Sequence, residues 1–192
     1  MATRMQPFQF VVFVLAIVLV GWNSSAHGQM PGPPLPHDPA HAEQATTWCA
    51  LHLARREIVA ALSDCDYAVA RDPKDVAALS NRGAVWLLAG DPKRAIVDFD
   101  AALALKPEDA GLHFNRGLAH DNAGFPDRAI ADYSAAIGLN PQMAIAFHNR
   151  GAVYERTSRR RLAVDDYTRA LAINPTLQAS RDALRRLQGA DM

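Results

Sequence analysis

Apolar residues recur with a helical period along two adjacent segments of the stretch from Asn81 to Pro107. The first segment is amphipathic and ends near Ala89-Gly90-Asp91, a combination that favours a turn. The second begins at Pro92, a residue common in the first turn of a helix, and the Asp91 side chain can cap its free N–H groups. The pattern predicts two antiparallel helices, the second of which is ended by Pro107.

The same pattern returns every 34 residues. Positions 81–107 and 115–141 share 14 identities in 27 places, and a proline closes every unit at the same interval, at Pro73, Pro107, Pro141 and Pro175. A period of this length is typical of helical solenoids, in which each hairpin buries its apolar face only by stacking on its neighbours. We therefore expect an all-α fold, an α-solenoid of about four helical hairpins followed by a C-terminal capping helix.

Small and aromatic residues recur at fixed places in the units. Small residues let the two helices of a hairpin approach closely, and aromatic side chains fill the space between hairpins. The matching positions are Gly83, Trp86, Ala95, Phe99, Ala102 and Pro107, then Gly117, Ala129, Tyr133, Ala136 and Pro141, then Phe147, Gly151, Tyr154, Ala163, Tyr167, Ala170 and Pro175. These positions resemble the signature of the tetratricopeptide repeat (TPR) family, of the exported bacterial type. The resemblance implies a scaffold that binds a protein or peptide.

The chain is expected to divide into seven parts. A signal peptide and a proline-rich linker precede the repeats, and a capping helix with a short tail follows them. The expected ranges are 1–28 for the signal peptide, 29–41 for the linker, 42–75 for a degenerate first repeat, 76–109, 110–143 and 144–177 for the second to fourth repeats, and 178–192 for the cap and tail.

The N-terminal segment has the order of parts of a secretory signal peptide. Arg4 precedes an apolar run from Phe8 to Trp22, and a small polar patch follows in which cleavage could come after Ala26 or Gly28. We therefore expect an exported protein in the periplasm. The alternative is an uncleaved segment that anchors the chain to the inner membrane, and membrane contact is expected only in that case.

The two cysteines both lie in the degenerate first repeat, with Cys49 in the glycine position and Cys65 in the aromatic position. In an antiparallel hairpin these two positions face each other, and an oxidising compartment would allow them to form a disulfide. Two buried thiols or a redox pair are the alternatives.

One arginine and one aspartate recur in the units, and they suggest an ion-pair ladder. Three arginines stand against four aspartates, namely Arg82, Arg116 and Arg150 against Asp64, Asp98, Asp132 and Asp166. Pairing within a unit would leave Asp64 opposite Trp48. The sequence therefore favours pairing between units, with Asp64 joined to Arg82, Asp98 to Arg116 and Asp132 to Arg150.

In TPR arrays the first helices of successive units line the concave surface. The position held by Asn81, Asn115 and Asn149 resembles the asparagine ladder of O-linked N-acetylglucosamine transferase, whose side-chain amides bind the backbone of an extended peptide. Local hydrogen bonding between hairpins is the alternative role for these amides. Helical spacing from the asparagines adds Leu88, Phe114, Leu118, Asn122, His148 and Arg156 as candidate peptide-binding residues.

Composition narrows the choice of function. Twenty basic and 20 acidic residues give no net charge, so no nucleic-acid partner is expected. No phosphate loop, metal-ligand cluster or activated nucleophile is recognisable, so we expect no enzyme, no cofactor and no metal.

Two further features of the repeats could suggest a site. His113 and His120 are seven positions apart, which places both on one helix face, but two ligands do not make a metal site, so both are expected to be structural. The basic triplet Arg159–Arg161 is expected to be a solvated turn, with contact to a partner or an anionic membrane as the alternative.

Overall fold

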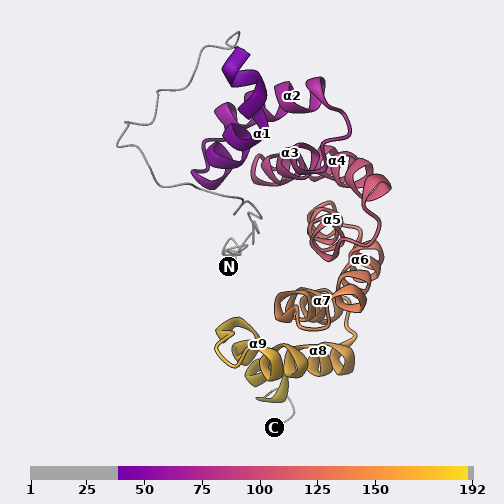
Figure 1. Ribbon diagram of the computed structural model, residues 1–192. Helices are drawn as coiled ribbons and strands as arrows, with labels where there is room; N and C mark the ends of the chain where they lie inside the picture. The colour runs from indigo at the N-terminus through magenta and orange to yellow at the C-terminus, as the bar shows by residue number, and fades with distance from the viewer. Residues whose placement is uncertain (1–38, 190–192) are drawn as a thin grey trace, which may run out of the picture.

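Successive helices pair into antiparallel hairpins that stack into a crescent (Figure 1). The computed structural model describes residues 39–189, with side chains described from residue 44, so the predicted signal peptide and most of the predicted linker lie outside the described residues. The helices are α1 (Pro39–Ala54), α2 (Ile58–Arg71), α3 (Val76–Leu88), α4 (Pro92–Leu105), α5 (Ala110–Asn122), α6 (Pro126–Leu139), α7 (Ala144–Arg156), α8 (Arg160–Ile173) and α9 (Gln178–Gly189). The all-α solenoid is confirmed.

The helix ends follow the local signals in the sequence. Asp91 accepts a hydrogen bond from the backbone N–H of Arg94 at 3.0 Å, and Pro92 occupies the first turn of α4, as predicted. Asp75 and Asp109 cap α3 and α5 in the same way. The helix α1 already begins at Pro39, inside the range expected for the linker.

Close contacts inside each hairpin explain the glycine and aromatic positions. A Cβ added at Gly83 would lie 2.9 Å from the ring of Phe99, and one at Gly117 would lie 2.8 Å from the ring of Tyr133. Phe99, Tyr133 and Tyr167 are almost fully buried. Each aromatic ring therefore takes the space that a larger residue on the partner helix would need.

The first hairpin uses cysteines at these two positions. Cys49 on α1 and Cys65 on α2 are fully buried, their Cα atoms are 4.9 Å apart, and the structure joins their sulfur atoms. The two helices therefore meet in the register that the sequence suggested.

The recurrent arginines are paired differently from the sequence prediction. Arg82 makes a two-pronged contact with Asp98 of its own hairpin, with N–O distances of 2.9 and 2.6 Å, and Arg116 and Arg150 contact Asp132 and Asp166 in the same way. Pairing with the aspartate of the preceding unit was wrong. In the first hairpin Asp64 faces His52, one turn beyond Trp48, with Nδ1 and Oδ2 2.6 Å apart.

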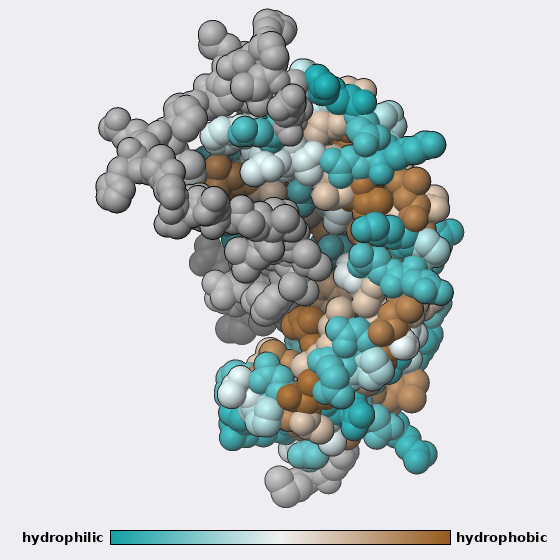
Figure 2. Space-filling model, viewed as in Figure 1, coloured by the Kyte–Doolittle hydropathy of each residue, from teal (hydrophilic) through white to brown (hydrophobic). Residues whose placement is uncertain are grey.

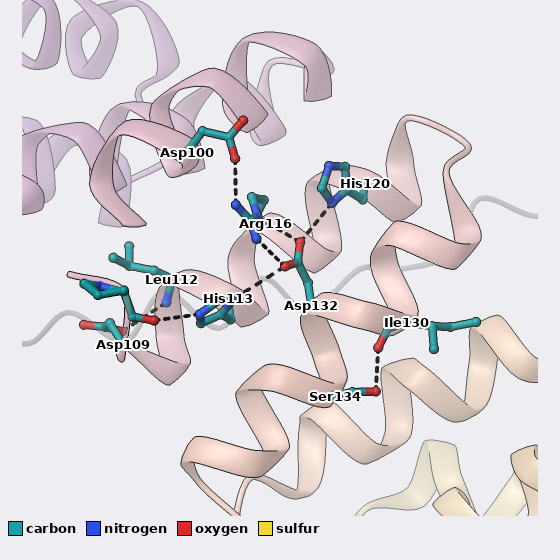
Figure 3. Close-up of polar contacts among 10 residues, drawn as sticks. Asp100, Asp109, Leu112, His113, Arg116, His120, Ile130, Asp132 and Ser134 are labelled. Carbon is teal, nitrogen blue, oxygen red and sulfur yellow. Dashed lines mark hydrogen bonds and ion pairs between the residues drawn. The ribbon is translucent and has the colours of Figure 1, made fainter. Parts of the chain in front are cut away.

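The same arginines also reach the preceding unit, through their remaining terminal nitrogen. Arg116 contacts Asp100 at 2.7 Å while holding Asp132, as Figure 3 shows. Arg82 contacts Asp66 at 3.0 Å, and Arg150 contacts the hydroxyl of Ser134 at 2.8 Å. Each arginine thus links three helices, although by a different inter-unit partner from the one predicted.

The helix α9 closes the C-terminal end of the array. Ser180 and Ala183 are buried, while Leu184 and Leu187 pack against the cluster of Ala163, Tyr167 and Ala183. Its capping role follows from this packing, because α9 covers a face of the last hairpin that would otherwise be exposed.

Candidate peptide-binding surface

The helices α1, α3, α5, α7 and α9 lie on the inner side of the crescent, and α2, α4, α6 and α8 lie on the outer side (Figure 1). We call the first set the inner helices and the second set the outer helices. Successive inner helices touch, since α1 contacts α3 and α3 contacts α5. Figure 2 shows hydrophilic and hydrophobic residues intermixed along the visible face, without a continuous apolar stripe.

The three recurrent asparagines lie half-buried on α3, α5 and α7. Within the described part of the chain, the side chains of Asn81 and Asn115 make no hydrogen bond. Asn149 lies near the hydroxyl of Tyr133, which is buried with no partner of good geometry among residues 44–189. Burial raises the pKa of Tyr133, so this hydroxyl keeps its proton. Two of the three amides are therefore unused by the described protein.

Two of the apolar candidates belong to the core. Phe114 is 3% exposed and Leu118 is 6% exposed, and both pack in one cluster with Tyr133. They offer little side-chain surface to a partner, so the candidate set loses them. Helical spacing could not reveal this, because it gives the face of the helix but not the depth to which the neighbouring hairpin covers it. Leu88 is half-buried, and Asn122 is exposed at the end of α5.

His148 holds the capping helix in place. Its Nδ1 lies 2.8 Å from the hydroxyl of Ser180 on α9, and its ring lies 5.4 Å from that of Tyr167. Burial lowers the pKa of His148, although the nearby Glu155 acts in the opposite direction. Although His148 is only half-buried, its ring is already engaged by Ser180 and Tyr167. This leaves it a smaller role in binding a partner than the sequence suggested.

Ion pairs between inner helices were missed by the sequence analysis. Arg156 on α7 pairs with Asp121 on α5, and Arg186 on α9 pairs with Glu155 on α7 at 2.9 Å. Burial raises the pKa of Asp121, and the charge of Arg156 opposes this shift. Their spacings of 35 and 31 residues differ from the period, so the repeat gave no signal for them. Arg156 remains about half exposed and available to a partner.

Stacked hairpins with one recurring set of packing residues point to a single family. A profile described as "Tetratricopeptide repeat" matches residues 50–110 and 114–178, more than half of the chain. The chain belongs to the tetratricopeptide repeat family. A search of curated proteins finds no match.

Solved TPR structures resemble this one. A crystal structure of MamA has a TM-score of 0.69 and 20% identity, covering 74% of this chain and 84% of that chain. A thermophilic TPR protein of Thermus thermophilus, TTC0263, has a TM-score of 0.66 and 21% identity, covering 80% and 82%. The first TPR of Spaghetti (RPAP3), bound to the HSP90 peptide SRMEEVD, has a TM-score of 0.59 and 24% identity, covering 62% and 94%. At these identities the likeness shows the fold alone.

The TPR family consists in general of non-enzymatic scaffolds for protein partners, and the histidines of the third repeat have structural contacts. His120 lies 2.9 Å from Asp132, and Nε2 of His113 lies 2.8 Å from the carbonyl oxygen of Pro107. Among the described residues, no group of three or more His, Cys, Asp or Glu side chains is arranged to hold a metal ion. In residues 39–189, no helix combines the length and apolar character needed to span a bilayer.

Proposed function

We propose that this TPR protein is a non-catalytic scaffold that binds a protein or an extended peptide along its inner surface, in the cell envelope. The observation that carries the proposal is the pair of unused amides, Asn81 and Asn115, at the same place in successive repeats. A primary amide offers two donors and an acceptor, so it can bind peptide backbone of any sequence. A half-buried amide with no internal partner gains a hydrogen bond when such a backbone arrives.

Replacing Asn81, Asn115 and Asn149 together by alanine tests this proposal. The variant should lose the partners that wild-type protein captures from the compartment in which it resides, while its thermal unfolding stays close to that of the wild type. A matched control replaces three exposed residues of the outer helices, Val97, Asp165 and Arg169, by alanine and should keep the partners. Unchanged partners with unchanged stability in the asparagine variant would refute the ladder.

The envelope location rests on the apolar run from Phe8 to Trp22 and the small polar patch after it. N-terminal sequencing of the mature chain separates the two forms that this run allows. A start at His27 or Gln29 supports an exported periplasmic scaffold. A chain that retains Met1 or starts before Phe8 supports the alternative function, a membrane-tethered envelope assembly factor.

A further inference from the structure

The turns that join inner to outer helices lie along one edge of the solenoid, which we call the turn edge. It comprises residues 55–60, 89–94, 123–128 and 157–162, the turns with the first residues of each outer helix. Stacked hairpins in one register place these segments side by side. The contact between Arg159 and Asp127, 2.8 Å across adjacent turns, shows this directly for the third and fourth repeats.

Charge is unevenly divided between the two edges. The turn edge carries eight basic and three acidic residues, whereas the opposite edge, residues 71–76, 105–110, 139–144 and 173–178, carries three basic and four acidic residues. A protein with no net charge thus has one positive edge. Within the described part of the chain, no acidic partner is found for Arg55, Arg56, Lys93 and Arg161, all of them exposed.

Large apolar side chains are exposed among these cations. Val59 is 85% exposed, Leu162 is 46% exposed and Phe125 is 41% exposed. The guanidinium of Arg128 lies 5.3 Å from the centre of the Phe125 ring, so the ring is held beside a cation at the surface. Exposed apolar residues that alternate with basic ones are typical of surfaces that lie in the headgroup region of a membrane.

Two of these turns, including the most basic one, break local rules of backbone and helix stability. Arg56 and Ser158 have φ values of 60° and 61°, at the place where the middle repeats have glycine. Arg159 precedes α8 without a side-chain cap, and Arg160 and Arg161 follow at the positive end of the helix. Basic residues there oppose the helix dipole, which makes this position unfavourable for the stability of α8. Such local conflicts often mark binding surfaces.

We infer that the turn edge docks on an anionic phospholipid surface. Basic side chains would contact lipid phosphates, and Val59, Phe125 and Leu162 would enter between the headgroups. A nucleic acid would use the positive charge but would leave the exposed aliphatic side chains without a role, which favours lipid. This contact uses the folded repeats and does not depend on the N-terminal segment, and it leaves the inner surface free for a peptide.

The test measures co-sedimentation of the full-length chain with vesicles of phosphatidylcholine, with and without phosphatidylglycerol. The increase in binding caused by phosphatidylglycerol reports the electrostatic contact, because any insertion of the apolar N-terminal run occurs in both vesicles. We expect this increase in the wild type and its loss at high salt. Arg55→Glu, Lys93→Glu and Arg161→Glu combined should lower it at least about tenfold.

A matched control reverses three exposed cations of the opposite edge, Arg71→Glu, Lys74→Glu and Lys106→Glu, and has the same net charge. It should bind nearly as the wild type does. A second variant, Val59→Ser with Leu162→Ser, should weaken binding without a change of charge. Equal loss in both charge variants, or wild-type binding to DNA but not to the anionic vesicles, would overturn the assignment.

Discussion

At the scale of single residues, the fold depends on glycines whose missing side chain leaves room for an aromatic ring. A Cβ on Gly117 would lie only 2.8 Å from the ring of Tyr133, and this ring cannot shift in a packed hairpin. Gly138 is different, because nothing lies within 4 Å of the Cβ it could carry. Substitution of Gly117 therefore reports on close packing, whereas substitution of Gly138 reports on the backbone entropy of glycine.

Gly117→Ala should lower the free energy of unfolding by about 1–3 kcal/mol, because the added methyl group overpacks the hairpin. Gly138→Ala, within α6, should raise it by about 0.5–1 kcal/mol through helix propensity. Urea unfolding of both variants followed by circular dichroism gives the comparison. A stabilised Gly117→Ala variant would show that the hairpin is less tightly packed than the structure indicates.

Ser158→Gly tests strain in the fourth turn. Ser158 has a φ of 61°, a left-handed conformation that glycine occupies at +80° and +79° in the second and third repeats. The substitution should stabilise the protein by roughly 0.5–1 kcal/mol, because relief of strain exceeds the entropy that glycine adds to the unfolded chain. Gly90→Ala, the reverse change in the second repeat, should destabilise it. Relative to the wild type, the midpoint of urea unfolding should rise for Ser158→Gly and fall for Gly90→Ala.

At the scale of elements, each recurrent arginine joins three helices. Arg82 holds Asp98 within its hairpin and Asp66 of the preceding hairpin, and these bonds raise the pKa of Arg82. The Asp98 side chain is 4% exposed and that of Asp66 is 57% exposed. The contact with Asp98 within the hairpin therefore contributes more to stability than the contact with Asp66, since an exposed pair contributes little in water.

Double-mutant cycles distinguish the observed pairing from the pairing that the sequence suggested. Arg82→Ala with Asp98→Ala should show a coupling free energy of about 0.5–3 kcal/mol in unfolding experiments. Arg82→Ala with Asp64→Ala should be additive within about 0.5 kcal/mol, because Asp64 contacts His52. Coupling of Arg82 to Asp64 instead would restore the inter-unit ladder.

Docking of α9 should depend on pH through His148. Burial lowers the pKa of this imidazole from 6.5, so below that pH the unfolded chain binds the proton more readily than the folded one. Stability should therefore fall as the pH drops below 6.5. His148→Gln can still bond to Ser180 but does not titrate there, and its unfolding free energy should decline less over the same range. If the unfolding free energies of the wild type and His148→Gln declined equally with pH, the pH dependence would arise from groups other than His148.

At the scale of the whole molecule, the period determines which parts of the structure can be predicted. The start of α4 at Pro92, its Asp91 cap, the glycine and aromatic positions and the facing of Cys49 and Cys65 follow from one hairpin, and they agree with the structure. The start of α1 at Pro39 does not, because the first unit is degenerate. The burial of Phe114, the contact of His148 with α9 and the pair of Asp121 with Arg156 depend on how hairpins stack. Stacking adds a twist between units that no single repeat encodes.

The stacked arrangement also localises the effect of the proposed disulfide. Oxidation of Cys49 and Cys65, 16 residues apart, should stabilise the first hairpin by about 3 kcal/mol. Repeats contact only their neighbours, so reduction should raise amide hydrogen exchange in α1 and α2 and leave α5 to α9 protected. Mass spectrometry of protein from its native compartment first establishes the bond, and two free thiols there would refute it. The variant with both cysteines replaced by serine should not respond to reductant, and loss of protection in every repeat would show that the array unfolds as one unit.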